Sequence, residues 1–522
     1  MADYLFINGT ILTMNPETPR AEAVLTRADQ IRFVGSEAEA KAQMAPHTQV
    51  IDLQGQCLMP GFHDSHVHLG QHGFELSQLN LSKAATKEEG LALVAQAARE
   101  VPEGEWILGA GFLMARWGVS ELGKLELDQV APNHPVLLRS QDHHSAWVNS
   151  LALERAKISA TTPNPAEGEI VKDADGEPTG LILERAVGLI SDVIPEVSDE
   201  ALSRAIRAAA DHFASLGITT VHHMSYDSAD QWREMALQAS QEEYSVRVWA
   251  CIRQEDIEHA AALGLATGQG GKHFQVGGAK FFADGALGSL TALMKEPYEG
   301  TTTRGVEIHG RKVLQERFPL AIAAGLTPVI HAIGDAANET VLDVLEETQP
   351  LWQAKKMRPR IEHAQHLTPK DIARFARLGV IASMQPIHFR FDAVRTAELL
   401  GERINTTHAW RSLTDSGAVL PLGSDTPVAT PDVIEGLKAA VRRQAESGQV
   451  YGREQVLTIT EALAGYTRHA AYCINWEGRS GQLKAGFDAD LVILSHDPQQ
   501  TLEGLEVIST LKAGYWTYGG RV

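Results

Sequence analysis

The middle of the chain alternates short apolar stretches with stretches of helical character, and this alternation restricts the possible folds more than any other feature. In the clearest example, residues 360–363 form a predicted strand and Thr368 caps a predicted helix. Pro369 lies in the first turn of that helix, and Gly379 ends it before the next strand at 380–384. Further apolar strands are predicted at 219–223, 327–331 and 419–423. This α/β pattern indicates a parallel sheet and favours a closed (β/α)8 TIM barrel, with a doubly wound open sheet as the alternative.

The first 58 residues follow a different pattern, in which extended stretches are joined by tight turns. Asn8-Gly9 separates residues 4–7 from residues 10–14. Because both turn positions can adopt positive φ, this arrangement predicts a β-hairpin. Residues 23–26 and 31–34 predict a second pair of strands.

The last 40 residues resemble the first ones in pattern, with a predicted strand at 489–494 and an alternating stretch at 510–518. We therefore expect both ends of the chain to build one small β-sandwich domain. The expected boundaries are 1–58 and 481–522 for the two parts of this domain and 59–480 for the barrel. Residues from about 70 to 200 fit the barrel pattern badly and are expected to form a large insertion near its mouth.

Charge and cysteine content exclude several classes of protein. The 522 residues include 46 basic and 66 acidic side chains, and the net charge of −20 disfavours binding to nucleic acid or to an anionic membrane surface. Cys57, Cys251 and Cys473 have no paired spacing, so neither a disulfide framework nor a thiolate zinc site is expected. No signal peptide and no apolar stretch of about 18 residues is found. We expect a soluble cytoplasmic protein.

The sequence His66-Val67-His68 ends an apparent strand that follows Pro60-Gly61. Side chains at positions i and i+2 of a strand point to the same face, so these two imidazoles can converge on one metal ion. Asp64 shares that face and could orient a ligand. The alternative is a pair of solvated or core histidines.

Four further predicted strand ends carry side chains that can bind metal: Lys280, His331, His363 and Asp425. In a parallel barrel all strand C-termini open on one face, so residues distant in sequence meet there. Each residue has a structural alternative. Lys280 could pair with a carboxylate, the two histidines could be core residues, and Asp425 could cap a helix.

These residues belong to motifs that resemble the amidohydrolase superfamily, and more narrowly its YtcJ-like subfamily (amidohydrolase family 3), which includes N-substituted formamide deformylases. The resemblance rests on residues 59–68, 280–285, 331–335, 361–364 and 423–427, and on residues 481–491, which look like the closing β module of the superfamily. It therefore extends over nearly the whole chain and implies a metal-dependent hydrolase.

The resemblance also implies a role for each motif residue. His66, His68 and Asp425 match the ligands of one divalent ion, and His331 and His363 match those of a second. Lys280 matches a lysine that reacts with CO2 in many members and bridges two metals as N6-carboxylysine. One or two ions per chain are expected, with Zn²⁺ as the first candidate. A single-metal site with an unmodified lysine is the alternative.

The function implied by these motifs is hydrolysis of a non-peptide C–N bond in an amide, a formamide or a related small molecule. Water activated by the metal would attack the carbonyl carbon, and Asp425 would act as general acid and base. The same site could instead hydrolyse an ester, a lactone or a cyclic amide, or deaminate a heterocycle. The alternative from another class is an inactive barrel that serves as a binding module. A homo-oligomer, a dimer or larger, is also expected from the superfamily.

Candidate substrate contacts are less sharply defined by the sequence. Residues 142–150 resemble a segment of the same subfamily in which His144 matches a histidine that could donate to a developing oxyanion, while His143 stands where the subfamily has glycine. The remaining candidates are polar or aromatic residues near predicted strand ends or apolar pockets: His222, His223, His388, Trp117 and Trp147.

Overall fold

The computed structural model describes residues 2–119, 121–140, 145–165, 168–195, 199–225 and 228–520. The chain forms two compact units. One consists of Met1–His72 and Ile206–Val522, and the other of Gly73–Ala205.

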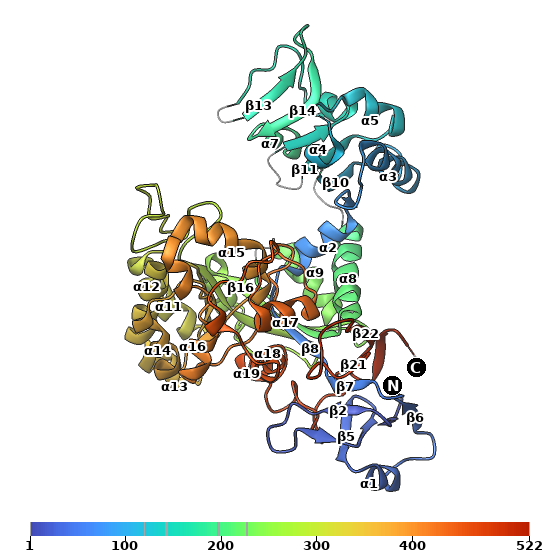
Figure 1. The fold of residues 1–522 in the computed structure, drawn as a ribbon, viewed down its shortest axis with the longest axis vertical. Coiled ribbons are helices and arrows are strands. Elements are labelled where there is room, and N and C mark those ends of the chain that lie inside the picture. The colour runs from blue at the N-terminus through green and yellow to red at the C-terminus, as the bar shows by residue number, and fades with distance from the viewer. Residues whose placement is uncertain are drawn as a thin grey trace. The chain divides into compact units, whose positions relative to one another are not determined.

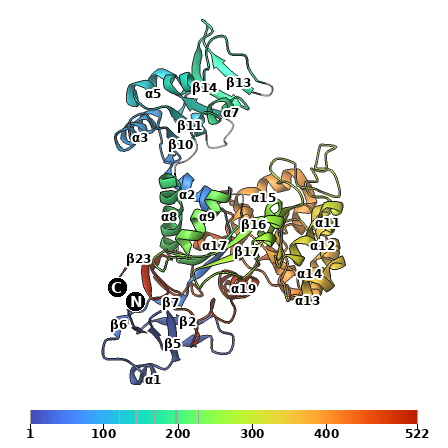
Figure 2. The same ribbon diagram turned by 180° about the vertical axis from the view of Figure 1, so that it is seen from behind.

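The described part of the first unit contains a sheet of seven parallel strands that curves into a barrel (Figures 1 and 2). In spatial order the strands are β8 (Phe62–Val67), β15 (Ile218–His223), β16 (Arg247–Arg253), β17 (Phe274–Phe282), β18 (Pro328–Ala332), β19 (Arg360–His363) and β20 (Ile381–Ser383). Most of their residues are buried on both faces, which explains why the strands appear as apolar runs in the sequence.

Residues 420–426 close the barrel between β20 and β8 without forming a regular strand. On one side, Met384 forms a parallel bridge to Leu422, and on the other side Val67 forms one to Thr426. Backbone hydrogen bonds support both joints: the Met384 N–H donates to Pro421 O at 3.1 Å, and the Asp425 N–H donates to His66 O at 2.7 Å. The predicted eight-membered barrel is therefore closed by seven strands and one irregular segment.

Helices cover the outside of the barrel, and the βαβ unit predicted at 360–384 is confirmed. Helix α14 (Pro369–Leu378) begins after Thr368 and ends at Gly379, which adopts a left-handed conformation with φ of 79°. Strands β19 and β20 on either side of it pair in parallel. Both views show α14 beside α12 (Asp335–Glu347) and α11 (Arg311–Ala323) (Figures 1 and 2).

Strands from both ends of the chain form the predicted sandwich. One sheet has the order β5-β4-β1-β6 and the other the order β23-β22-β21-β7-β2-β3, so the second sheet joins N-terminal to C-terminal strands. Their bounds are β1 (Tyr4–Ile7), β2 (Thr10–Leu12), β3 (Arg20–Ala21), β4 (Ala23–Arg27), β5 (Gln30–Gly35), β6 (Gln49–Asp52), β7 (Cys57–Pro60), β21 (Leu491–Leu494), β22 (Val507–Lys512) and β23 (Tyr515–Tyr518). A shared apolar core with members such as Phe6, Leu58 and Ile493 lies between the sheets.

The hairpin predicted at Asn8-Gly9 is wrong, although the predicted pairing of β4 with β5 is confirmed. Strand β1 pairs with β4 and β6, whereas β2 pairs with β3 and β7 in the other sheet. Asn8, at φ of 58°, thus turns the chain from one sheet into the other. A Cβ on Gly9 would lie 2.5 Å from Gln56 O, so this crossing needs glycine.

The second unit has its own six-stranded mixed sheet with the order β13-β14-β12-β11-β10-β9. The strands are β9 (Leu79–Asn80), β10 (Ile107–Phe112), β11 (Val136–Ser140), β12 (Ser145–Val148), β13 (Gly168–Lys172) and β14 (Pro178–Glu184). Helices α3 (Lys87–Glu100) and α5 (Lys124–Val130) contribute to an apolar core against this sheet. The antiparallel pairs explain why this region departs from the strand and helix alternation of the barrel.

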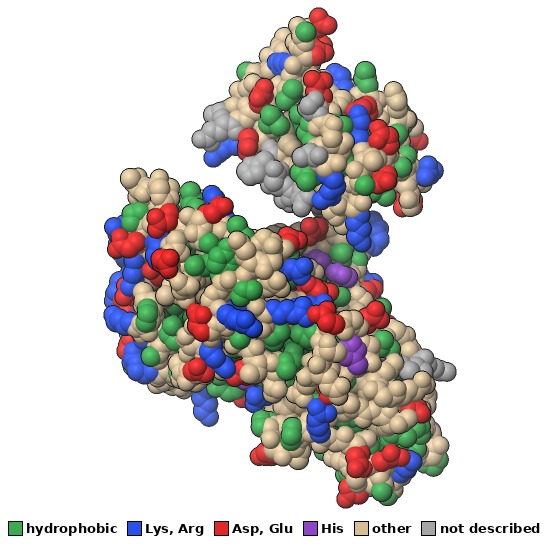
Figure 3. Space-filling view, in the orientation of Figure 1, with side chains coloured by type: hydrophobic (Ala, Val, Ile, Leu, Met, Phe, Trp, Pro, Cys, Tyr) green, Lys and Arg blue, Asp and Glu red, His purple; other side chains and the backbone are tan. Residues whose placement is uncertain are grey.

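No helix in the described ranges combines the length and apolar character that a membrane crossing requires. On the face drawn in Figure 3, the basic and acidic side chains of the described residues are interspersed.

Candidate metal centre

The C-terminal ends of the barrel strands bring the predicted ligands together. One ligand atom each of His66, His363 and Asp425 lies within 4.8 Å of the others, and all three residues are buried. Asp425 Oδ1 lies 3.2 Å from His66 Nε2 and 3.1 Å from His68 Nε2. His66 on β8 and His68, one residue beyond the end of β8, thus converge on one carboxylate oxygen, as their i and i+2 spacing predicts.

His331 and Lys280 extend this cluster on the neighbouring strands β18 and β17. The ring centroid of His331 lies 4.5 Å from that of His363. Lys280 is 1% exposed, and its Nζ has no hydrogen-bond partner among the described residues. The Nζ lies 5.0 Å from the centroid of the Phe282 ring. A buried amine without a hydrogen-bond partner indicates that a ligand completes its surroundings.

The electrostatics of the cluster favour an ionised Asp425 and neutral imidazoles at His331 and His363. Burial alone would lower the pKa of His66, but the Asp425 carboxylate raises it. Burial lowers the pKa of His363 well below its usual value and that of His331 to about 3. Burial alone would raise the pKa of Asp425, but the neighbouring His66 and His68 hold it well below its usual range. Neutral imidazole nitrogen and carboxylate oxygen are the donors that divalent transition metals prefer. These residues therefore fit a divalent metal ion.

Two of the converging residues have backbone conformations that side chains other than glycine rarely adopt. His363 has φ of 73° and Asp425 has φ of 64°. Each lies where its strand or closing segment ends, so the turn of the backbone directs the side chain into the cluster. Such strain costs on the order of 1–3 kcal/mol per residue and is typical of functional sites.

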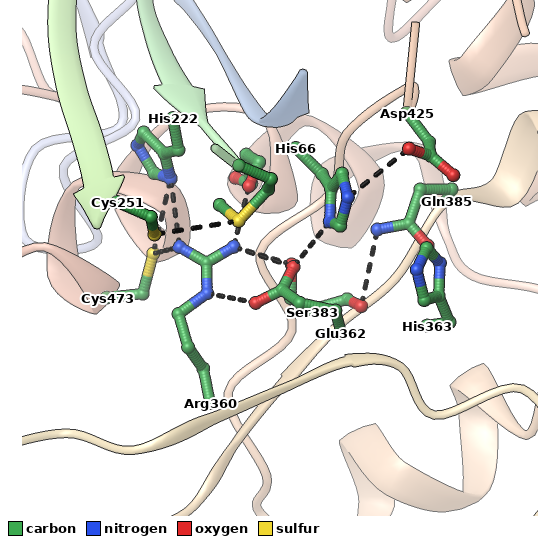
Figure 4. Close-up of polar contacts among 12 residues, drawn as sticks. His66, His222, Cys251, Arg360, Glu362, His363, Ser383, Gln385, Asp425 and Cys473 are labelled. Carbon is green, nitrogen blue, oxygen red and sulfur yellow. Dashed lines mark hydrogen bonds and ion pairs between the residues drawn. The ribbon is translucent and has the colours of Figure 1, made fainter. Parts of the chain in front are cut away.

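A buried network behind the cluster involves two residues that the sequence analysis did not assign a role. His66 Nδ1 donates to Glu362 Oε2 at 2.7 Å, and Glu362 accepts two hydrogen bonds from Arg360 at 2.5 and 3.0 Å (Figure 4). Arg360 and Glu362 both have 0% exposure. Burial alone would raise the pKa of Glu362, but Arg360 and His66 hold it well below its usual range. The sequence offered one signal for this network: Arg360 and Glu362 carry opposite charges at positions i and i+2 of a short strand, and that strand is fully buried in the structure.

Other polar groups orient the cluster. Asp64 Oδ1 accepts hydrogen bonds from the backbone N–H groups of His66 and Ser424, at 3.1 and 3.0 Å. It thereby joins β8 to the closing segment. His363 Nδ1 donates to Gln385 Oε1 at 2.8 Å. This bond leaves His363 Nε2 available as a ligand atom.

A model of the amidohydrolase family matches residues 49–518. The chain belongs to the amidohydrolase family. It is 34% identical to the putative amidohydrolase YtcJ of Bacillus subtilis (strain 168) over 98% of both chains. It is 28% identical to the N-substituted formamide deformylase of Arthrobacter pascens, over 99% of this chain and 98% of that protein. A solved structure of an uncharacterized metal-dependent hydrolase from Pyrococcus horikoshii OT3 matches with a TM-score of 0.80 and 29% identity, over 96% of this chain and 99% of that one.

Membership in the family makes this amidohydrolase a hydrolase and implies a divalent metal. It confirms the predicted resemblance and the predicted α/β barrel fold. The individual ligand and substrate roles stay predictions.

The predicted substrate contacts of the amidohydrolase differ in whether they lie beside the proposed metal ligands. His388 Nε2 lies 3.7 Å from Asp425 Oδ2, and the His388 ring stacks with that of His363 at 6.1 Å. His222 is fully buried, and its Nδ1 accepts a hydrogen bond from Arg360 at 3.2 Å. His223 Nδ1 accepts one from the backbone N–H of Leu69 at 3.1 Å. His388 is therefore the predicted contact that lies beside the proposed ligands.

The remaining predicted contacts lie in the second unit or outside the described residues. Trp117 and Trp147 belong to the apolar core of the second unit, where their indole N–H groups donate to Ala84 O and Gly123 O, each at 3.0 Å. His144 lies outside the described residues. The structure therefore leaves the oxyanion role predicted for His144 as a prediction.

Proposed function

We propose that the protein hydrolyses a non-peptide C–N bond of a small amide or formamide, with one or two zinc ions as cofactor. The observation that supports this proposal is the convergence of His66, His68 and His363 on the carboxylate of Asp425. Lys280 lies on a neighbouring strand, and its Nζ has no hydrogen-bond partner among the described residues. The name of the Arthrobacter relative supports formamides as the first substrates to test.

In this proposal His66, His68 and Asp425 would hold one ion, and His331 and His363 would hold a second. Lys280 would complete the ligand set after its neutral amine attacks CO2, a reaction that forms one N–C bond, breaks one C–O π bond of CO2 and releases one proton to solvent. The carbamate then offers two oxygens where the unmodified amine offers one nitrogen. The buried Nζ, with no hydrogen-bond partner among the described residues, supports this modification.

Bound zinc supplies Lewis acidity, which acidifies a water molecule and polarises the substrate carbonyl. The protein's own residues move the protons. Asp425 accepts the proton of the attacking water while the new C–O bond forms, and returns it to the leaving nitrogen when the C–N bond breaks. The products are a carboxylic acid and an amine. His388, 3.7 Å from Asp425 Oδ2, is placed to contact the substrate beside this carboxylate.

The three cysteines support a reducing compartment, and we place the protein in the cytoplasm. Cys57, Cys251 and Cys473 are all buried free thiols. Disulfides are rare in reducing compartments.

Asp425→Asn tests the mechanism. Because the amide cannot accept the proton, we expect kcat for N-substituted formamides and simple amides to fall by about 10²–10⁴. The fold and most of the zinc content should be retained. A parallel panel of esters and cyclic imides would identify a different scissile bond.

Asp497→Asn is the matched control, because Asp497 pairs with Arg20 at 2.9 Å in the first unit and belongs to no proposed ligand set. It should keep the wild-type rate. Near-wild-type turnover by Asp425→Asn, or a wild-type protein that contains no metal after growth with added zinc, would contradict the proposed function.

A further inference from the structure

The guanidinium of Arg360 is the centre of a fully buried network that spans four strands of the barrel, β8, β15, β19 and β20. Its Nη2 donates to Ser65 O on β8 at 2.6 Å and to Ser383 Oγ on β20 at 2.8 Å. Its Nη1 contacts His222 Nδ1 at 3.2 Å and Cys473 Sγ at 3.5 Å. With Nε and Nη2 also bound to Glu362, every nitrogen of the guanidinium has a partner. The group is therefore fixed on all sides.

Glu362 links the fixed guanidinium of Arg360 to the ring of His66. The carboxylate is held at both oxygens by Arg360, and its Oε2 accepts the hydrogen bond from His66 Nδ1. Because Nδ1 is engaged in this way, the opposite nitrogen, Nε2, faces Asp425 at 3.2 Å. Figure 4 shows the sequence Arg360, Glu362, His66 and Asp425 as one continuous line of contacts.

Stability alone does not explain a fully buried ion pair at this place. Taking two charges out of water is unfavourable, and apolar side chains of similar volume often stabilise a fold equally well. A second buried pair in the same unit provides a comparison. Arg247 binds Asp490 at 2.6 and 3.0 Å. That pair contacts Lys272 O and the Ala513 N–H, and its contacts among the described residues include no proposed metal ligand.

We infer that Arg360 and Glu362 are positioning residues that fix the ring of His66 for metal binding. Glu362 selects which ring nitrogen faces the metal and makes that nitrogen a stronger donor, and Arg360 holds Glu362 in place. A carboxylate behind a histidine ligand acts in this way in metal sites generally, and its loss weakens metal binding about 10–100-fold. The inference rests on the proposed function, because it requires His66 to be a ligand.

Zinc affinity of the metal-depleted full-length protein tests this inference, measured by competition with a chromophoric chelator. Glu362→Gln keeps the side-chain shape and removes the charge, and we expect zinc to bind it about 10–100-fold more weakly than the wild type. The absorption spectrum of the cobalt-substituted protein should also change, because a neutral amide behind His66 makes Nε2 a weaker donor to the metal. Asp490→Asn is the matched control. It disturbs an equally buried pair, so it should lower stability and leave zinc affinity and the cobalt spectrum unchanged.

A double variant covers the case in which Glu362→Gln does not fold. Arg360→Met with Glu362→Leu leaves no unpaired buried charge and removes the acceptor for His66, so it should weaken zinc binding at least as much. Wild-type affinity in either folded variant, or equal weakening in Asp490→Asn, would overturn the inference. A wild-type protein that binds no zinc would overturn the proposed function itself and the inference with it.

Discussion

Replacing Lys280 by methionine should stabilise the metal-depleted protein while it abolishes hydrolysis. The Nζ of Lys280 is buried and has no hydrogen-bond partner among the described residues. An unpaired buried polar group of this kind costs about 1–3 kcal/mol. Methionine has a similar length and no polar group to desolvate. The free energy of unfolding should therefore rise by about 1–3 kcal/mol. The lost attraction of the Lys280 ammonium to Glu362 and Asp425 makes this rise smaller.

Lys512→Met is the matched control and should act in the opposite direction. Lys512 is also fully buried, but its Nζ donates to Glu242 O and Tyr244 O, each at 2.8 Å. Its removal leaves the buried carbonyl group of Tyr244 and the partly buried carbonyl group of Glu242 without this donor, and it costs about 1–3 kcal/mol. Because Lys512 lies far along the chain from the proposed ligands and contacts none in the described residues, the folded variant should keep its activity.

Thermal melting of the metal-depleted proteins measures the effect on stability. For a cooperative unit of several hundred residues, the expected rise for Lys280→Met is on the order of 1–4 °C. The zinc-loaded variant should hydrolyse no substrate. The wild type is expected to give a carbamate resonance with carbon-13 bicarbonate, and the variant should lack it. A lower melting temperature for Lys280→Met, or retained turnover, would refute the reasoning that Lys280 is kept for ligand binding.

Two further substitutions test contacts within the first unit, one away from the proposed ligands and one beside them. Asp490→Asn should lower the free energy of unfolding by about 3–5 kcal/mol, because it breaks the buried pair with Arg247. Burial alone would raise the pKa of Asp490, but Arg247 lowers it, so the pair stabilises the fold above the ordinary carboxyl pKa near 4. This contribution is lost as the pH falls through the folded-state pKa of Asp490. The difference in melting temperature between the wild type and Asp490→Asn should therefore shrink as the pH falls through this range. A constant gap would contradict the assignment. Gly423→Ala should reduce kcat about 10²-fold, because its Cβ would lie 2.7 Å from Asp64 Oδ1 and displace the closing segment. Gly478→Ala, which meets open space, should match the wild type in a kinetic assay, and equal rates for both variants would exclude a role for this close approach.

The barrel and its ligand-type residues could be predicted because each depends on local sequence. Apolar strands, the cap at Thr368 and the glycine at 379 are local signals, and the strand ends follow from them. The i and i+2 spacing of His66 and His68 fixes their common face without any tertiary information. The topology of the barrel then brings the distant strand ends together.

The failures arose where a tertiary contact decides between two local possibilities. Asn8-Gly9 is compatible with a hairpin, but packing against Gln56 makes it a crossing between sheets. Likewise, Glu362 is visible in the sequence as a charge in an apolar strand. Its contact with His66 joins residues 296 positions apart and requires the closed barrel. No local pattern specifies such a contact.

The segment that closes the barrel is synthesised long after the first barrel strand, so the site cannot assemble until most of the chain has been made. His68 and Asp425 are 357 positions apart. At about 5–20 residues per second, roughly 20–70 s pass on the ribosome between the emergence of these two residues. The interval between the synthesis of β7 and that of its partner strand β21, which begins at Leu491, is longer still. The nascent chain must therefore keep the open edges of β7 and β8 from pairing with other chains during this interval.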